Sequence, residues 1–166
     1  MTIKLIRIDD RYIHGQVTIG WVRHYNINEI WVVDDKIARN PVLKELQIAL
    51  APPNTTVRVF HVQEAIDELR KGSGDRPGVN IMIIVSNAND CLKVVKESGL
   101  KINWVNAGQS AWRQGRVIVV KNYAVDPAEI NAFKEMREMG IKVIYQMLPD
   151  EQPQDFYQLL QKKGIL

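Results

Sequence analysis

The sequence predicts an α/β fold: one domain built on a doubly wound, mostly parallel seven-stranded sheet with helices on both faces. Seven short runs rich in β-branched and aromatic residues recur along the chain. Most of them are separated by stretches in which apolar residues have helical spacing. Strands that alternate with helices favour a parallel sheet covered on both sides, and right-handed crossovers leave few ways to wind it. We expect residues 1–166 to form this single domain.

The strands are expected where β-branched residues dominate, because such side chains pack well on a pleated surface. In chain order they are 3–8 (IKLIRI), 29–34 (EIWVVD), 56–60 (TVRVF), 80–86 (NIMIIVS), 101–107 (KINWVNA), 116–123 (RVIVVKNY) and 142–148 (KVIYQML). No helical pattern lies between Gly99 and Lys121. The fifth and sixth strands should therefore be joined by a short loop, which makes one edge of the sheet antiparallel or irregular.

Helices fill the other gaps between strands. The first is QVTIGWVRHY at 16–25, and the next begins at Pro41, whose missing N–H suits the first helical turn. Further helices are expected from Gln63, Asn89, Asp126-Pro127 and about Gln154. The segment GSGDRPG at 72–78 is interpreted as a flexible surface turn, because both flanks continue the same alternation.

Composition limits the classes of protein to consider. The hydrophobic fraction of 46% and the charged fraction of 25% are those of an ordinary globular protein, and no apolar run approaches the roughly 18 residues of a membrane span. We expect a cytoplasmic protein without a leader segment. The single Cys91 cannot form an internal disulfide, and the net charge of +3 comes from scattered residues that predict no nucleic-acid partner.

The stretch RIDDRYIHGQV at 7–17 joins the first strand to the first helix and contains the main candidate residues. In open α/β sheets, ligands bind beyond the carboxyl ends of the strands. His14 is expected there, just before a helix whose free N–H groups attract anions. The guanidinium of Arg11 could hold two oxygens of a phosphoryl group, and Gly15 lets such a group approach the backbone.

These residues favour a phosphoryl group carried on His14, since imidazole is largely neutral in the cell and one ring nitrogen can attack phosphorus. Asp9 and Asp10 would repel the phosphoryl group, so we assign them to orienting the imidazole or Arg11, or to tying the loop together. An isolated loop histidine would more often be a plain surface residue. A non-catalytic anion-binding or signalling module of the same fold stays open as the alternative.

The run RIDDRYIHGQVTIGWV resembles the phosphorylation loop of the IIB subunits of the bacterial sugar phosphotransferase system, in the mannose, fructose and sorbose class. The family signature is approximately R-I-D-x-R-L-I-H-G-Q-V, and the runs VVDD at 32–35 and VNAG at 105–108 also fit. Tyr12 replaces a usual leucine, which we interpret as a packing change. Gln109 replaces a frequent second glycine, which weakens the case for a phosphate contact by that loop.

The resemblance implies a sugar phosphotransferase in which Nδ1 of His14 receives a phosphoryl group from a IIA histidine. It also implies transfer to a sugar held by membrane IIC and IID subunits, with a peripheral association of this chain with the transporter. Neither a metal nor an organic cofactor is expected. Arg11 would act with His14, and the residues expected to bind the phosphoryl group or support the loop are Gly15, Gln16, Asp9 and Asp10.

Other polar residues are weaker candidates. His61 is expected to start a helix without taking part in chemistry, and His24 to complement a helix dipole. Three dispersed histidines and one cysteine make a zinc site improbable. Residues expected at strand ends, where they would either contact a phosphate or partner or form caps and turns, are Asp34, Asp35, Ser86, Asn87 and Asn106 to Gly108.

Two rival classes of protein fit the sequence poorly. A receiver domain needs an aspartate at the end of the third strand, where this chain has Phe60-His61. A nucleotide-binding enzyme needs a glycine-rich motif in the first loop, and this chain has none there.

Transfer of a phosphoryl group between the histidines of two proteins requires an exposed loop, surrounded by a ring of cations and apolar patches. The cations expected in that ring are Arg7, Arg11, Arg23 and Lys36.

Overall fold

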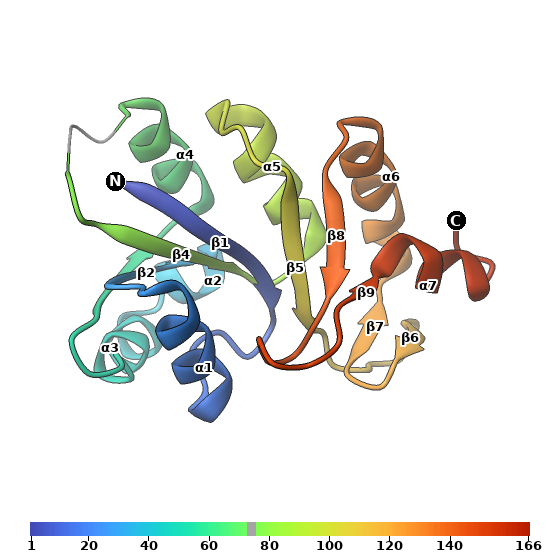
Figure 1. Cartoon of the computed structure of the whole chain (residues 1–166), viewed down its shortest axis with the longest axis horizontal. Helices are drawn as coiled ribbons and strands as arrows, with labels where there is room; N and C mark the ends of the chain where they lie inside the picture. The colour runs from blue at the N-terminus through green and yellow to red at the C-terminus, as the bar shows by residue number, and fades with distance from the viewer. Residues whose placement is uncertain (73–75) are drawn as a thin grey trace.

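The computed structural model describes residues 1–72 and 76–166 and contains a seven-stranded sheet flanked by helices (Figure 1). Its strands are β1 (Thr2–Asp9), β2 (Glu29–Val33), β3 (Thr56–Phe60), β4 (Asn80–Val85), β5 (Trp104–Gln109), β8 (Lys142–Tyr145) and β9 (Gln154–Asp155). Across the sheet their order is β3-β2-β4-β1-β5-β8-β9, and every neighbouring pair is parallel except β8 and β9. The predicted fold class is therefore confirmed.

The helices lie on both faces of this sheet. They are α1 (Gly15–Tyr25), α2 (Asp35–Ala38), α3 (Pro41–Ala49), α4 (Val62–Arg70), α5 (Ala88–Ser98), the 3₁₀ turn η1 (Pro127–Glu129), α6 (Ile130–Glu138) and α7 (Phe156–Lys162). In Figure 1, α4, α5 and α6 lie on one side of the strands, and α1 and α3 lie on the other. In the described part of the chain, no helix is long and apolar enough to cross a membrane.

The core is divided by the sheet, because successive side chains of a strand point to opposite faces. In β2, Ile30 and Val32 pack in the same cluster as Trp21 of α1, whereas Trp31 and Val33 belong to the cluster on the face of α4, α5 and α6. These central strands are apolar on both faces. That composition is typical of a parallel sheet covered on both sides.

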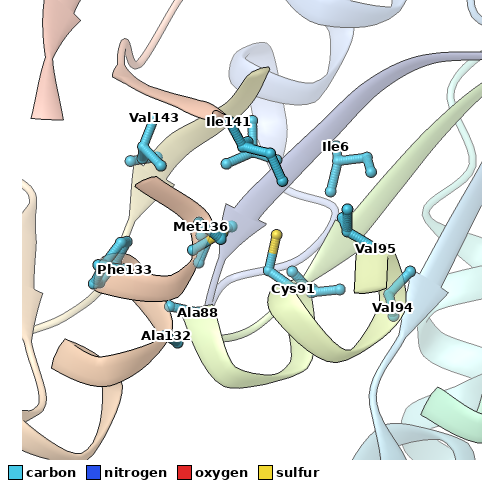
Figure 2. Packing of buried hydrophobic residues seen from close by; sticks show 14 of the residues in the cluster. Ile6, Ala88, Cys91, Val94, Val95, Ala132, Phe133, Met136, Ile141 and Val143 are labelled. Atoms are coloured by element: carbon cyan, nitrogen blue, oxygen red, sulfur yellow. The ribbon is translucent and has the colours of Figure 1, made fainter. Parts of the chain in front are cut away.

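The larger cluster joins α5 and α6 to the sheet. Figure 2 shows Cys91 and Val95 of α5 close to Met136 of α6 and Ile6 of β1. Cys91 is fully buried, and burial raises the pKa of its thiol to about 12. We infer that this cysteine contributes to packing and not to chemistry.

Two details of the predicted topology are wrong. The segment 116–123 does not form one strand of the main sheet: it turns at Lys121 and Asn122 and forms a separate antiparallel hairpin of β6 (Val117–Val120) and β7 (Tyr123–Val125). The antiparallel edge of the main sheet is instead β9, where a helix was expected to begin. The expected turn at 72–78 includes residues 73–75, which lie outside the described residues.

Candidate functional site

The loop between β1 and α1 places His14 at the start of a helix. His14 is the N-cap residue of α1, and its backbone N–H donates to Oγ1 of Thr18 at 2.9 Å. No side chain from the described residues caps this helix terminus. The first N–H groups of α1 therefore remain available to an anion beside the imidazole.

The same loop contains two residues with left-handed backbone conformations. Tyr12 has a φ of 57° and Gly15 a φ of 44°. A Cβ added to Gly15 would meet no atom within 4 Å, so this glycine is required by its backbone conformation and leaves open space beside His14. Such a conformation is costly for tyrosine, and strained residues of this kind often mark functional loops.

Tyr12 also connects the loop to the end of β2. Its hydroxyl donates to Oδ2 of Asp34 at 3.0 Å, and burial together with the Asp34 charge raises the pKa of Tyr12. The replacement of the usual leucine is therefore more than a packing change, because it adds a hydrogen bond that holds the strained loop in place.

Behind His14 lies a buried ion pair. Nε2 of His14 is 2.9 Å from Oδ2 of Asp9, and the same oxygen accepts from Nε of Arg7 at 3.0 Å. An ionised carboxylate only accepts hydrogen bonds, so Nε2 is the ring nitrogen that carries the hydrogen. The two nitrogens of an imidazole point in roughly opposite directions, and Nδ1 therefore faces away from Asp9 with its lone pair unused by this contact.

The two loop carboxylates hold backbone groups in addition to side chains. Oδ1 of Asp9 accepts from the N–H of Arg11 at 2.9 Å, and Oδ2 of Asp10 accepts from the N–H of Ala111 at 2.8 Å. Asp9 thus contacts both the imidazole of His14 and the backbone of the loop. Asp10 instead ties this loop to the segment after β5, near Arg116, whose Nη1 lies 3.9 Å from Oδ2.

Exposure differs sharply within the loop. Arg11, Gly15 and Gln16 are exposed, whereas the side chain of His14 is only 10% exposed and that of Asp9 is buried. The expectation of an exposed loop holds for Arg11, Gly15 and Gln16, but Ile13 is buried and the imidazole is largely covered. Since Nε2 faces the buried Asp9, a partner can reach the ring only along its remaining edge.

The prediction of Arg7 as a surface cation is wrong. Its side chain is 2% exposed and lies between β1, β5 and the segment after β8. Arg11, Arg23 and Lys36 are exposed, but Arg23 lies in the last turn of α1, at the other end of that helix from His14. Burial of a guanidinium is tolerated here because Asp9 supplies the opposite charge.

The proposed neutral donors at the strand ends are already engaged within the protein. Asn106 is fully buried, accepts from Nη1 of Arg7 and donates to the carbonyls of Ile144 and Gln146. Ser86 donates to Asp34 at 2.8 Å, and Asn87 caps α5. The idea that Asn106 offers a donor to a phosphate is therefore wrong, and the other two residues have structural partners.

The remaining candidates have the simpler of the tasks expected for them. His61 is the N-cap residue of α4, with Nδ1 3.3 Å from Oδ1 of Asp35, and Asp34 caps α2. His24 lies in the last turn of α1 and contacts the ring of Tyr25 edge-on at 4.6 Å between centroids. None of these three residues contacts His14 in the hydrogen bonds and ring contacts of the described residues.

A polar cavity of about 180 Å³ opens beside the His14 loop. It lies where the connections after β1 and β4 leave for opposite faces of the sheet, the usual position of a ligand crevice in doubly wound folds. Its lining residues are Asp10, Tyr12, Asp34, Lys36, Ser86, Asn87, Arg113 and Arg116. Sequence reasoning missed the two arginines, because nothing local connects the segment after β5 to the first loop.

Comparisons with known proteins agree with this geometry. The profile of a family described as "PTS system sorbose subfamily IIB component" matches residues 3–166. The chain is 39% identical over 145 residues to the PTS system mannose-specific EIIAB component of Escherichia coli, which covers 86% of this chain and 43% of that protein. The chain therefore spans less than half the length of that relative.

Two further relatives match over nearly their whole length. The PTS system fructose-specific EIIB component of Bacillus subtilis is 32% identical over 160 residues, which covers 96% of each protein. The crystal structure of the IIBSor domain of the sorbose permease from Klebsiella pneumoniae has a TM-score of 0.88 at 29% identity, with 98% of both chains covered. The similarity thus includes the entire sheet and the loop that carries His14.

Proposed function

Because this chain belongs to the sorbose subfamily of IIB components, which are phosphotransferases of the sugar phosphotransferase system, we propose that it carries a phosphoryl group on Nδ1 of His14. The donor is a phosphohistidine of a IIA subunit or domain, and the acceptor is a sugar held by membrane IIC and IID subunits. Residues 1–166 act as one IIB domain, cytoplasmic and peripherally attached to the transporter. The observation that carries the proposal is the contact between Nε2 and Asp9, which leaves Nδ1 as the unprotonated nitrogen.

Transfer begins with the lone pair of Nδ1 directed at the phosphorus of the donor. The transition state is loose and spreads charge over three equatorial oxygens, so positioning and electrostatics supply most of the catalysis. In this proposal the exposed guanidinium of Arg11 holds two of those oxygens, while the first N–H groups of α1 face the third. Gly15 leaves the space that this group needs.

The surface around the loop supports docking to an anionic partner. The exposed cation Arg11 accompanies Lys36 and Arg113 of the polar cavity, and Trp112 is 61% exposed in the segment that Asp10 ties to the loop. A phosphohistidine is anionic, so a positive ring with an apolar contact suits a transient complex. A second hollow, of about 540 Å³, lies between α1 and residues 148–150.

Phosphotransfer from a purified IIA donor labelled with radioactive phosphate tests the proposal. The wild-type chain should acquire an acid-labile, base-stable label, and His14→Gln should fold normally and acquire none, because a loop side chain contributes little to the core. The matched control is His61→Gln, which makes the same exchange at the N-cap of α4 and should be labelled like the wild type.

The outcomes separate three interpretations. Label retained in His14→Gln and lost in His61→Gln would move the phosphorylation site to His61. Failure of the wild-type chain to acquire label from any donor would leave the non-catalytic anion-binding module as the better description. Subsequent transfer to a panel of sugars in membranes that contain IIC and IID subunits tests the second half of the proposal.

A further inference from the structure

We propose that Arg7 is a positioning residue of the phosphoryl transfer: it keeps Asp9 anionic, and Asp9 in turn keeps the ring proton of His14 on Nε2. This inference rests on the proposed function, and it assigns a task to a residue that does not touch the phosphoryl group. The observations that carry it are the complete engagement of the buried guanidinium and the space that β5 leaves for it.

The guanidinium of Arg7 is held on every side. Its Nε donates to Asp9 at 3.0 Å, and its Nη1 donates to Oδ1 of Asn106 and to the carbonyl of Gln146, the latter at 3.1 Å. Its Nη2 lies 3.5 Å from the sulfur of Met147, and the ring of Trp21 lies 5.8 Å from Cζ. A side chain fixed by so many contacts has one position, and so does the carboxylate that it bonds.

The run VNAG at 105–108 makes room for this arrangement. A Cβ added to Gly108 would lie 2.2 Å from Cζ of Arg7, which is far too close, and Gly108 does not have a positive φ. The absence of a side chain is therefore required by the guanidinium and not by a turn. Asn106 has its own amide held by the carbonyls of Ile144 and Gln146, so that only its oxygen is directed at Arg7. This run therefore forms the buried site that the guanidinium of Arg7 occupies.

Asp9 supplies the counter-charge to Arg7 in this buried site. Burial lowers the pKa of Arg7, and the charge and hydrogen bond of Asp9 oppose that effect. The other titratable groups that act on Arg7 are the hydroxyls of Tyr123 and Tyr145, and burial raises the pKa of Tyr123, which keeps that hydroxyl neutral. The ion pair of Arg7 and Asp9 therefore presents an anionic oxygen to Nε2 of His14.

The ion pair determines which nitrogen of His14 attacks. In the accepting step, the lone pair of Nδ1 forms a bond to phosphorus, the donor's P–N bond breaks, and that electron pair returns to the donor ring. The phosphorylated ring of His14 then carries a positive charge, with its proton still on Nε2. Asp9 stabilises that cation, and a protonated ring is the better leaving group when phosphorus is attacked next.

Without the cation of Arg7, the contact between Asp9 and Nε2 of His14 has the opposite effect on the position of the ring proton. A buried carboxylate that has lost its counter-charge takes up a proton. Asp9 would then donate to Nε2, the ring proton would reside on Nδ1, and the attacking lone pair would be lost. Displacement of the Arg7 guanidinium from its buried site should thus change the tautomer of His14 and slow acceptance of the phosphoryl group.

Two variants and a control test this inference. Gly108→Ala should displace the guanidinium without removing its charge, and Arg7→Lys should keep a cation beside Asp9 but lose the contacts to Asn106. Tyr157→Phe removes a buried hydrogen bond from α7 to Ile141 and serves as a control for general destabilisation. For each protein we would measure the ¹⁵N chemical shifts of His14 and the rate of phosphoryl acceptance from the IIA donor.

We expect Gly108→Ala to shift the ring proton from Nε2 toward Nδ1 and to slow acceptance by about 10- to 100-fold, an effect as large as that of losing the carboxylate or carbonyl partner of a metal-ligating histidine. Arg7→Lys should retain most of the wild-type tautomer, and Tyr157→Phe should leave both measurements unchanged. Wild-type shifts and rates in Gly108→Ala would overturn the inference. Absence of label on the wild-type chain would instead overturn the proposed function, so the two failures are distinguishable.

Discussion

Replacement of Asp9 by asparagine should cost this protein far more stability than replacement of the histidine that it contacts. Asp9→Asn keeps the shape of the side chain but leaves the guanidinium of Arg7, 2% exposed, without a counter-charge. Breaking one partner of a buried ion pair typically costs about 3 to 5 kcal/mol. For a chain of this size, that loss lowers the melting temperature by about 6 to 20 °C.

Urea denaturation followed by tryptophan fluorescence measures this loss, because Trp21 and Trp31 are fully buried and become exposed on unfolding. The midpoint should fall and the slope m should stay constant, as expected when stability changes without a change in the surface exposed. His14→Gln removes one hydrogen bond from the same carboxylate and should change the unfolding free energy by only about 1 kcal/mol. An Asp9→Asn protein as stable as His14→Gln would refute the assignment of Asp9 as the counter-charge.

Four other results are expected. Arg11→Lys should slow phosphoryl acceptance roughly 10- to 100-fold by losing one charge-assisted hydrogen bond, whereas Arg137→Lys on α6 should not, and equal rates would exclude Arg11 from the transition state. Acceptance should slow as salt rises, and rates indifferent to salt in stopped-flow measurements would remove electrostatic steering. Burial alone would raise the pKa of Glu29, but Arg76 and other donors lower it below its ordinary 4.5. The ionised carboxylate therefore stabilises the folded state, and the free energy of unfolding should fall as the pH drops below 4.5. The fall should be smaller in Glu29→Gln. Cys91 should resist alkylation in the native state and react only after unfolding, so rapid native labelling would contradict its burial.

The fold was predictable because the central strands are apolar on both faces and alternate with helices. The helix that begins at Pro41 was placed correctly, since the ring of proline and the apolar spacing act within one turn. The strand at 116–123 was not, because the polar pair Lys121 and Asn122 ends the β-branched run at Val120 and forms a turn, and composition does not reveal which sheet a run joins. The pairing of β9 with β8 depends on contacts between segments that local patterns do not describe.

The candidate site was predictable only where its residues are adjacent in the sequence. His14, Gly15 and the start of α1 follow from a strand end beside a helix start, and both features are local. Arg113 and Arg116 reach the cavity from the segment after β5, and the hydroxyl of Tyr12 meets Asp34 from β2. Such meetings depend on the order of the strands in the sheet, which the sequence pattern left undetermined.

Arg7 and Asp9 form a local signal in the sequence whose meaning depends on where their strand lies in the sheet. In β1, Ile6 and Ile8 belong to the cluster on the face of α4, α5 and α6, so the residues between and beside them point to the face of α1. Arg7 and Asp9 are two positions apart in this strand and therefore lie side by side on one face, within reach of a salt bridge. β1 lies between β4 and β5 and not at an edge, so the space above it on that face is covered by α1 and cannot be solvent. An arginine at this position has to be buried with its own counter-ion, and the aspartate two residues later, at the end of the strand, is the only acidic side chain that the strand itself provides.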